Sequence, residues 1–417
     1  MSKFRTAGSI AAGGAPSILL ATLIAGVAMY LATLVVYREL GSAPYVLFAA
    51  YWSLLYLVVG SLSGVQQEMT RATRAISEGS DPQTSKAKWF AVGLSTLVAV
   101  SIIGTSSLWA EAFLGTQGVE LVWPVALGSA SYVLVASLAG SLFGLSKWTS
   151  IALMTAFDGL IRLGLLAIAL AFTDDVVILA WCVSAAFPLA IAVLWPFTRK
   201  GFVNRTFLDV SIKKLTLNIS QTLTASTSAA LIINGLPLLI VYAAEGIEQS
   251  FVGDLILTIT IIRAPIIVIA MSMQSFLVVK FRDRKTSTLA PVLKILLAIS
   301  VVTALTAFLG YRAGPEFLEI LTGRPLLIDG NLFSLVLLSS GLVAAMIVSG
   351  SNLLAKGKHL FYSAGWFAAA LTSVVTITAP LEFSERVFST LLFGPVSGLL
   401  VFLGAGLLLR FRSSKQI

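Results

Sequence analysis

The chain has 417 residues, of which 57% are apolar and only 11% are charged, whereas soluble domains carry roughly 25% charged residues. Its 28 basic and 19 acidic residues could not cover the water-facing surface of a soluble protein of this size. The composition therefore excludes most classes of soluble enzyme and indicates a polytopic membrane protein. The single cysteine, Cys182, excludes a disulfide framework, and the single histidine, His359, argues against a histidine-based metal site. We expect no metal and no cofactor.

Twelve segments are long and apolar enough to cross a bilayer core of about 30 Å, which takes roughly 20 residues of helix. Their hydrophobicity is nearly continuous, which is typical of helices rather than of alternating barrel strands. The first segment is too long for the apolar core of a signal peptide, so we expect an uncleaved anchor. The predicted fold class is all-α, with about 12 transmembrane helices at 16–37, 44–66, 88–109, 121–145, 149–172, 176–197, 217–243, 250–279, 289–311, 331–354, 359–380 and 388–409.

Basic residues gather on one side of these spans. When both termini are placed in the cytoplasm, 22 of the 28 basic residues fall in cytoplasmic segments, and twelve of the 19 acidic residues fall on the opposite side. This is the distribution that the positive-inside rule describes, so the positive charge reflects topology and attraction to anionic lipid. We expect a multi-pass protein of the bacterial cytoplasmic membrane, with no nucleic-acid partner.

The cytoplasmic connection at 201–216 falls between the sixth and seventh spans and divides the chain into two six-helix lobes, 1–200 and 217–417. An even number of spans returns the chain to the same side of the membrane, so two related lobes would be parallel repeats. The first and seventh spans also close on similar sequences, Val35-Val36-Tyr37 and Ile240-Val241-Tyr242.

Ionised residues near the middle of a span cost several kcal/mol and normally face a cavity or a partner. Asp158 and Arg162 lie one turn apart on the fifth span, in the favourable order for an ion pair. They form either a self-neutralising pair that tightens helix packing or a pair whose guanidinium faces a cavity. Arg263 lies about thirteen residues into the eighth span, with no acid three or four residues away. Asp254 projects from the opposite side of that helix, near its external N-terminus, so we interpret it as structural.

Uncharged polar residues recur at helical spacing on several spans. Thr260 and Gln274 share a face with Arg263, and the seventh span is interrupted at Asn234-Gly235-Leu236-Pro237. Packing of hydroxyls and small residues between helices explains any single stripe. Together with two buried arginines, the stripes favour a central hydrated cavity lined by Tyr30, Tyr37, Asn218, Gln221 and Gln274.

Motifs for catalysis are weak. The sequence has no glycine-rich nucleotide-binding loop with a lysine, so we expect neither ATP hydrolysis nor another enzyme activity. The external pair Asp174-Asp175 is compatible with a metal-dependent glycosyltransferase that uses a lipid-linked sugar donor. Its loop is only a few residues long, however, and no large external domain could bind an acceptor.

Three stretches of the chain carry a resemblance to a known family. They are Gly64-Val65-Gln66-Gln67-Glu68-Met69-Thr70-Arg71, then Phe143-Gly144-Leu145-Ser146-Lys147 followed by Asp158-Gly159-Leu160-Ile161-Arg162, and finally Asn234 through Tyr242 with Glu245. They resemble segments of the Wzx-type polysaccharide flippases, whose superfamily includes the MATE multidrug antiporters and the lipid II flippase. Gly235 departs from the pattern, because many relatives have an acidic residue there, which argues against ion coupling through the seventh helix.

The resemblance implies two six-helix lobes that rock around a central cleft and move a polyprenyl-linked saccharide across the membrane. Arg263 and Arg162 would attract its phosphate or diphosphate, since guanidinium groups bind phosphate through charge-assisted, bidentate hydrogen bonds. Arg71 and Lys280 would recruit head groups at the cytoplasmic entrance, and Asp158 is the predicted titratable group for coupling to an ion gradient. The glycan would follow a path lined by Tyr30, Tyr37, Asn218, Gln221 and Gln274.

Two other functions stay open. A MATE-like antiporter of drugs or cations would favour unpaired acids in the cavity, whereas this chain offers an unpaired arginine. A membrane glycosyltransferase, the less favoured alternative, would need external carboxylates that converge on a metal. For a flippase we expect a polyprenyl-linked glycan, membrane lipid and other glycan-assembly proteins as partners, with the chain acting as a monomer in cell-envelope polysaccharide assembly.

Overall fold

The computed structural model describes residues 7–75, 84–202, 206–208, 210–282 and 289–414. Almost all of these residues are helical, as the near-continuous hydrophobicity predicts. The helices are α1 (Ala7–Leu40), α2 (Ser42–Ser61), α3 (Ser63–Ala72), α4 (Thr84–Gly104), α5 (Ala110–Leu114), α6 (Gly118–Gly144), α7 (Trp148–Leu170), α8 (Val176–Phe202), α9 (Ile212–Asn234), α10 (Leu236–Ala243), α11 (Gln249–Arg282), α12 (Leu289–Thr322), α13 (Gly330–Ala355), α14 (His359–Ile377) and α15 (Phe383–Ser414).

The number and order of the predicted spans are confirmed. Within the described residues, 11 helical spans are long and apolar enough to cross a membrane, and α9 with α10 makes up to 12 as one span bent by 67°. That bend falls at Gly235, inside the predicted interruption. The cytoplasmic placement of the termini stays a prediction.

The third span is shorter than predicted, because α4 ends at Gly104 rather than at residue 109. Directly after it, the Thr105 hydroxyl donates to the Ser101 carbonyl at 2.7 Å, and the Ser106 hydroxyl donates to the Ile103 carbonyl at 2.7 Å. Hydroxyls that bond to nearby carbonyls compete with the helix for these groups. The chain continues through a short 3-10 turn and α5 before α6 begins.

The chain forms two compact units that are not contiguous in sequence. Unit 1 contains residues Met1–Val36 and Ser61–Leu223, and unit 2 contains residues Tyr37–Gly60 and Thr224–Ile417. Most of α2 therefore packs with the C-terminal helices. The predicted lobe boundary at 201–216 stays a prediction.

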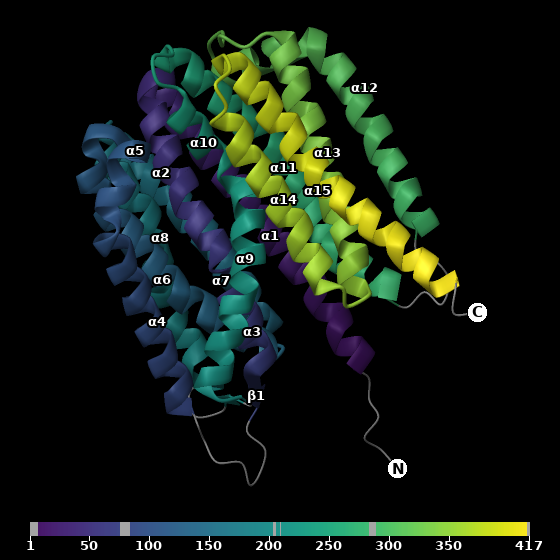
Figure 1. The fold of residues 1–417 in the computed structure, drawn as a ribbon. Coiled ribbons are helices and arrows are strands. Elements are labelled where there is room, and N and C mark those ends of the chain that lie inside the picture. Colours follow the sequence, from purple (N-terminus) through teal and green to yellow (C-terminus); the bar gives the residue numbers. More distant parts are fainter. Residues whose placement is uncertain (1–6, 76–83, 203–205, 209, 283–288, 415–417) are drawn as a thin grey trace. The chain divides into compact units, whose positions relative to one another are not determined.

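The two units repeat one packing order. In unit 1, α6 packs against α3, α4 and α8, and α7 packs against α8. In unit 2, α13 packs against α11, α12 and α15, and α14 packs against α15 (Figure 1). Helix α6 is the fourth span and α13 is the tenth. Each is the central helix of its unit, and the three spans that it contacts occupy equivalent places in the order of the two units. This agrees with the predicted parallel repeat.

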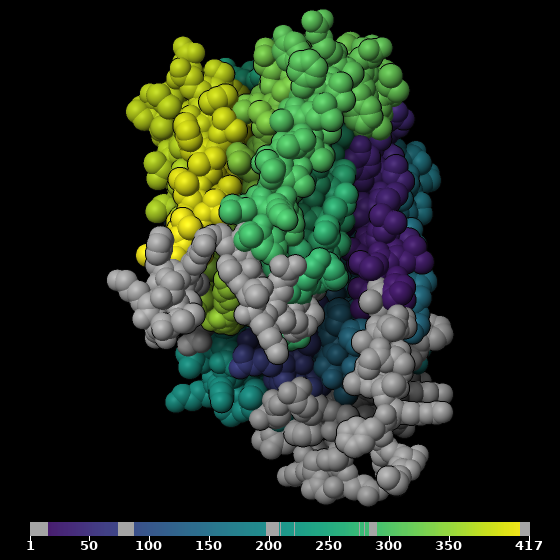
Figure 2. Space-filling view, turned by 90° about the vertical axis from the view of Figure 1, so that its right-hand side faces the viewer, coloured from purple at the N-terminus to yellow at the C-terminus, as the bar shows by residue number. Residues whose placement is uncertain are grey.

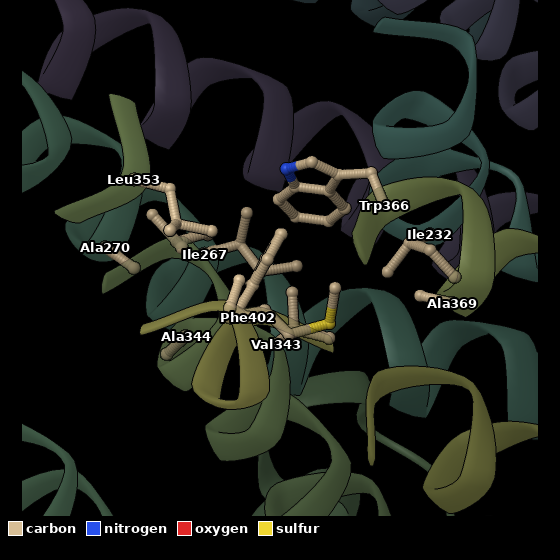
Figure 3. Packing of buried hydrophobic residues seen from close by; sticks show 12 residues of the cluster. Ile232, Ile267, Ala270, Val343, Ala344, Leu353, Trp366, Ala369 and Phe402 are labelled. Carbon is tan, nitrogen blue, oxygen red and sulfur yellow. The ribbon is translucent and has the colours of Figure 1, made fainter. Parts of the chain in front are cut away.

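The core of unit 2 is an apolar cluster around Trp366, Phe402 and Met346 (Figure 3). A Cβ atom at Gly365 would lie only 2.0 Å from Cε1 of Phe402, so the Phe402 ring occupies the space that a side chain there would need. Only a glycine lets the ring approach the α14 backbone so closely, and small residues have this role at many membrane helix interfaces. The cluster holds α11, α13, α14 and α15 together.

The surface of unit 2 is apolar along α12, the green helix at the front of Figure 2. An exposed apolar stripe of this length would be a liability in water, but in a bilayer it contacts acyl chains. The stripe is formed by Leu293, Leu297, Val301, Val302, Leu305, Phe308 and Leu309.

Two short strands in unit 1 were not predicted. β1 (Thr73–Ala75) pairs antiparallel with β2 (Thr206–Leu208), with Thr73 opposite Leu208. β1 lies in the connection between the second and third predicted spans, and β2 lies in the connection between the sixth and seventh. The pairing brings these connections to the same end of unit 1, as their predicted common side requires.

We expect Gly140→Ala to lower the melting temperature of the purified protein. A Cβ atom at Gly140 on α6 would lie 2.6 Å from the backbone oxygen of Gln66 and 2.7 Å from Cβ of Met69, so α3 and α6 would be forced apart. Overpacking of this kind costs about 1–3 kcal/mol.

The matched control is Gly164→Ala on α7, where a Cβ atom meets nothing within 4 Å. Alanine favours helix over glycine, so the control should keep or slightly raise the melting temperature. Equal melting temperatures for the wild type and Gly140→Ala would contradict the close packing of α3 on α6.

Candidate functional site

In unit 1, Asp158 and Arg162 form a buried ion pair on α7. Nη1 and Nη2 of Arg162 each donate to one oxygen of Asp158 at 2.9 Å. Nε donates to the Val183 carbonyl of α8 at 3.3 Å, and the guanidinium carbon lies 4.7 Å from the centre of the Phe187 ring. The Arg162 side chain is 0% exposed and the Asp158 side chain is 24% exposed.

These contacts compensate the positive charge of Arg162, because a bidentate carboxylate, a carbonyl and the face of an aromatic ring surround the guanidinium. Of the two interpretations left open by the sequence, the self-neutralising pair is the one that the geometry supports. A phosphate-binding role for Arg162 and a titrating role for Asp158 stay predictions, and both would require the pair to separate.

Arg263 on α11 is equally buried but differently surrounded. Its residue exposure is 5%, its Nη2 donates to the Ile232 carbonyl at 2.9 Å, and its Nε has no hydrogen-bond partner among the described residues. Ile232 lies in the last turn of α9, where backbone carbonyls have lost their regular helical donors. The α9–α10 break therefore supplies the acceptor that holds this guanidinium.

Arg263 lines a small cavity inside unit 2, of about 10 Å³. A volume of this size accommodates about one water molecule. The Ser339 side chain on α13 is fully buried, and its hydroxyl has no hydrogen-bond partner among the described residues. The other lining residues come from four helices, α9, α10, α14 and α15, and are Leu231, Ile232, Leu236, Leu239, Ser373, Thr390 and Pro395.

No sequence pattern indicated that Ser339, Ser373 and Thr390 line the same cavity as Arg263. Isolated serines and threonines are common in membrane helices, where they bond to their own helix or to adjacent helices. Only the packing of α11, α14 and α15 around α13 brings them to one cavity.

The rest of the predicted stripe on α11 divides into two parts. The Thr260 hydroxyl donates to the Ile256 carbonyl of its own helix at 2.8 Å. Gln274 is half-buried and lies within hydrogen-bonding reach of the Tyr362 hydroxyl of α14. Gln274 therefore remains a polar group inside unit 2, as the stripe predicts.

Two predicted site residues, Asn218 and Arg71, contact the same carboxylate in unit 1, that of Glu68. Nδ2 of Asn218 on α9 donates to Oε2 of Glu68 at 3.0 Å, and Oε1 of Glu68 lies 3.8 Å from Nη1 of Arg71. Arg71 is exposed, as a residue at an entrance would be, while Glu68 is buried. Tyr30 is half-buried on α1, and the Gln221 side chain lies outside the described residues.

Tyr37 and Asp254 form a buried pair in unit 2. The Tyr37 hydroxyl donates to Oδ1 of Asp254 at 2.5 Å, and the Leu327 backbone N–H donates to Oδ2 at 2.7 Å. The Arg324 guanidinium covers the Tyr37 ring at 4.6 Å. This geometry agrees with a structural Asp254. The predicted contact of Tyr37 with a glycan would require the fully buried tyrosine to leave this bond.

Lys280, the second predicted entrance residue, lies near the C-terminal end of α11. Its side chain is exposed, and Nζ lies 5.4 Å from the centre of the Phe276 ring. An exposed ammonium at the end of a span is available to anionic head groups. Its predicted role in recruitment stays a prediction.

Solved structures identify the architecture. The chain has the fold of the transporters of the MOP superfamily. An inward-facing multidrug resistance transporter of the MATE family superposes with a TM-score of 0.68 at 14% identity, covering 95% of this chain and 98% of that one. The lipid II flippase MurJ, in an inward closed conformation, gives a TM-score of 0.65 at 11% identity over 92% of this chain and 87% of MurJ.

Sequence relatives come from mycobacteria. The uncharacterized protein Rv1510 of Mycobacterium tuberculosis is 25% identical over 95% of this chain and 92% of its own length. The uncharacterized protein Rv3630 of the same species is 24% identical over 95% of this chain and 93% of its own length. The chain matches no protein-family model.

We expect Asp158→Ala to destabilise the protein more than the double variant Asp158→Ala/Arg162→Met does. The single substitution leaves a fully buried guanidinium without its carboxylate, whereas the double variant removes both charges. Breaking a buried pair costs about 3–5 kcal/mol, while replacing both partners with apolar groups is often neutral. Because Asp158 is 24% exposed, solvent screening places the expected loss at or below the lower end of that range.

Thermal unfolding of the three purified variants, including Arg162→Met alone, measures this coupling as a double-mutant cycle. Additive effects of the two single substitutions would contradict the self-neutralising interpretation.

Proposed function

We propose that this chain is a membrane transporter that flips an anionic, polyprenyl-linked saccharide across the cytoplasmic membrane for cell-envelope polysaccharide assembly. The fold supports a transporter, since both the MATE antiporter and MurJ share it. The fold by itself does not choose between a drug or cation antiporter and a lipid-linked-sugar flippase. The choice rests on the polarity of the buried charges.

The carboxylates inside the described units are all engaged. Glu68 and Asp254 are the buried acids among the described residues, and Asp158 is partly buried. Glu68 accepts from Asn218, Asp254 accepts from Tyr37 and Leu327, and Asp158 is paired with Arg162. A site for cations would need a carboxylate with free oxygens, because buried cations require paired anionic groups.

Arg263 is the opposite case, and it is the observation that carries the proposal. A buried guanidinium with one carbonyl acceptor retains donors for a ligand, and it binds phosphate by bidentate, charge-assisted hydrogen bonds. Moving a phosphate and a glycan through hydrocarbon without a protein is prohibitive. The polyprenyl tail needs no such path, since it can stay in the lipid.

The cavity at Arg263 is too small for a phosphate, so head-group binding requires this part of unit 2 to open. The bent α9–α10 segment is the natural place for such a movement, since non-helical backbone at membrane depth lines functional cavities in many transporters. In this proposal Tyr30, Asn218, Gln221 and Gln274 contact the glycan, with Arg71 and Lys280 at the entrance.

A MATE-like antiporter is the second candidate, because the MATE fold covers nearly the whole chain. The glycosyltransferase alternative has less support. Oδ1 of Asp175 accepts from the Val177 N–H at 2.8 Å, and thus caps α8. No group of three or more potential metal ligands of the His, Cys, Asp and Glu type occurs within the described residues.

We expect Arg263→Gln to reduce flipping of a fluorescent polyprenyl-diphosphate glycan in proteoliposomes at least tenfold. Loss of one charged hydrogen-bonding partner costs about 1.5–3 kcal/mol, and a tenfold change corresponds to about 1.4 kcal/mol. Arg263→Lys should keep part of the activity, because it keeps the charge but loses the bidentate geometry.

Lys280→Gln at the surface is the control for loss of a positive charge outside the buried site, and it should slow flipping only at low ionic strength and low substrate concentration, because salt screens the attraction of an exposed lysine for head groups. Wild-type flipping by Arg263→Gln at normal protein abundance would remove Arg263 from the site. Transport of a rhodamine-type cation by the wild type, without transport of the glycan, would favour the antiporter.

A further inference from the structure

The buried guanidinium of Arg263 has no counter-ion among the residues that the structure describes. Arginine remains protonated even when buried, and an uncompensated charge in a low-dielectric interior costs several kcal/mol. For Arg162 in unit 1 this cost is offset by the Asp158 carboxylate, which accepts two hydrogen bonds from the guanidinium at 2.9 Å. Within the described part of unit 2, no carboxylate lies within ion-pair distance of Arg263.

Asp254 is the buried acid on the same helix, but it does not serve this purpose. It precedes Arg263 by nine residues, which is roughly 13 Å along a helix axis. Both of its oxygens are engaged, one by the Tyr37 hydroxyl and the other by the Leu327 N–H. The described residues therefore supply no anionic group for this guanidinium.

We infer that the Arg263 cavity is a binding site for one small monovalent anion of the chloride class. Of the four buried polar residues that line it, two from different helices carry a polar atom with no partner among the described residues, namely Nε of Arg263 and the hydroxyl of Ser339. Both present N–H or O–H donors, and the site suits a ligand that only accepts hydrogen bonds. A water molecule would satisfy these donors, but it would leave the charge uncompensated.

The dimensions of the cavity favour a monatomic ion. Its volume of about 10 Å³ corresponds to one water-sized occupant, whereas a phosphate or sulfate has five heavy atoms. Most of the remaining wall is apolar, formed by Leu231, Ile232, Leu236, Leu239 and Pro395. Such a wall favours weakly hydrated halides over strongly hydrated anions, because the ion must leave most of its water behind. This inference stands independently of the transported substrate.

Halide-dependent thermal stability of the purified full-length protein tests the site. Chloride and bromide, compared with gluconate and sulfate at equal ionic strength, should raise the melting temperature saturably by roughly 3 °C, because a ligand of the folded state stabilises it. Bromide soaked into crystals should give an anomalous peak between Arg263 and Ser339. The same melting temperature in all four salts, or a bromide peak only elsewhere, would overturn the inference and leave water as the occupant.

Ser339→Ala and Ser349→Ala form a matched pair of variants. Both serines lie on α13, both are buried, and neither hydroxyl has a partner among the described residues, but only Ser339 lines the cavity. Ser339→Ala should raise the half-saturating halide concentration about tenfold, as expected for loss of one hydrogen bond to a charged group. Ser349→Ala should leave it unchanged. Equal effects of the two variants would overturn the assignment of Ser339.

Arg263→Met should remove the halide dependence entirely, because the charge that the anion balances is gone. If this variant does not fold, the Ser339→Ala titration still decides the question. Failure of glycan flipping by the wild type would not change any of these halide measurements, so the two proposals fail separately.

Discussion

A positive charge placed in a low-dielectric interior must be matched, and this constraint organises both units. Unit 1 meets it within the chain, since Arg162 binds both oxygens of Asp158 and faces a carbonyl and an aromatic ring of α8. Unit 2 does not, because Arg263 has one carbonyl acceptor and an unpartnered Nε among the described residues. A membrane protein with few charged residues has little reason to keep such a group unless it serves a ligand.

The break between α9 and α10 creates the surroundings of Arg263, and α2 stabilises it. Ser53 of α2 donates to the Asn234 carbonyl and accepts from the Leu238 N–H at 3.3 Å, while Nδ2 of Asn234 donates to the Tyr56 carbonyl at 3.3 Å. In a continuous helix the Leu238 N–H would donate to the Asn234 carbonyl, so the Ser53 hydroxyl bridges the donor and the acceptor of one helical hydrogen bond that the bend opens. Backbone groups freed at membrane depth require such partners, and the Ile232 carbonyl finds its own in Arg263.

The sequence predicted features that depend on local pattern and missed those that depend on tertiary contacts. The spans, the interruption at residues 234–237 and the Asp158–Arg162 spacing follow from hydrophobicity and helix geometry. The Tyr37–Asp254 bond joins residues 217 positions apart, and no local pattern encodes it. Ser339 carried no signal for the same reason, because only the packing of the helices brings it to the cavity that Arg263 also lines.

The two proposed ligands of Arg263 differ in size but share one electrostatic requirement. A cavity of about 10 Å³ admits a monatomic anion and excludes a phosphate, so the two ligands would belong to different arrangements of unit 2. Exchange of a small anion for a phosphate would keep the guanidinium matched in both arrangements, and the charge would never face hydrocarbon alone. The energetic barrier to opening the cavity is then set by the packing around the α9–α10 bend rather than by desolvation of a bare charge. A fold shared by antiporters and a flippase would in this way acquire its preference for anions from one arginine and the groups around it.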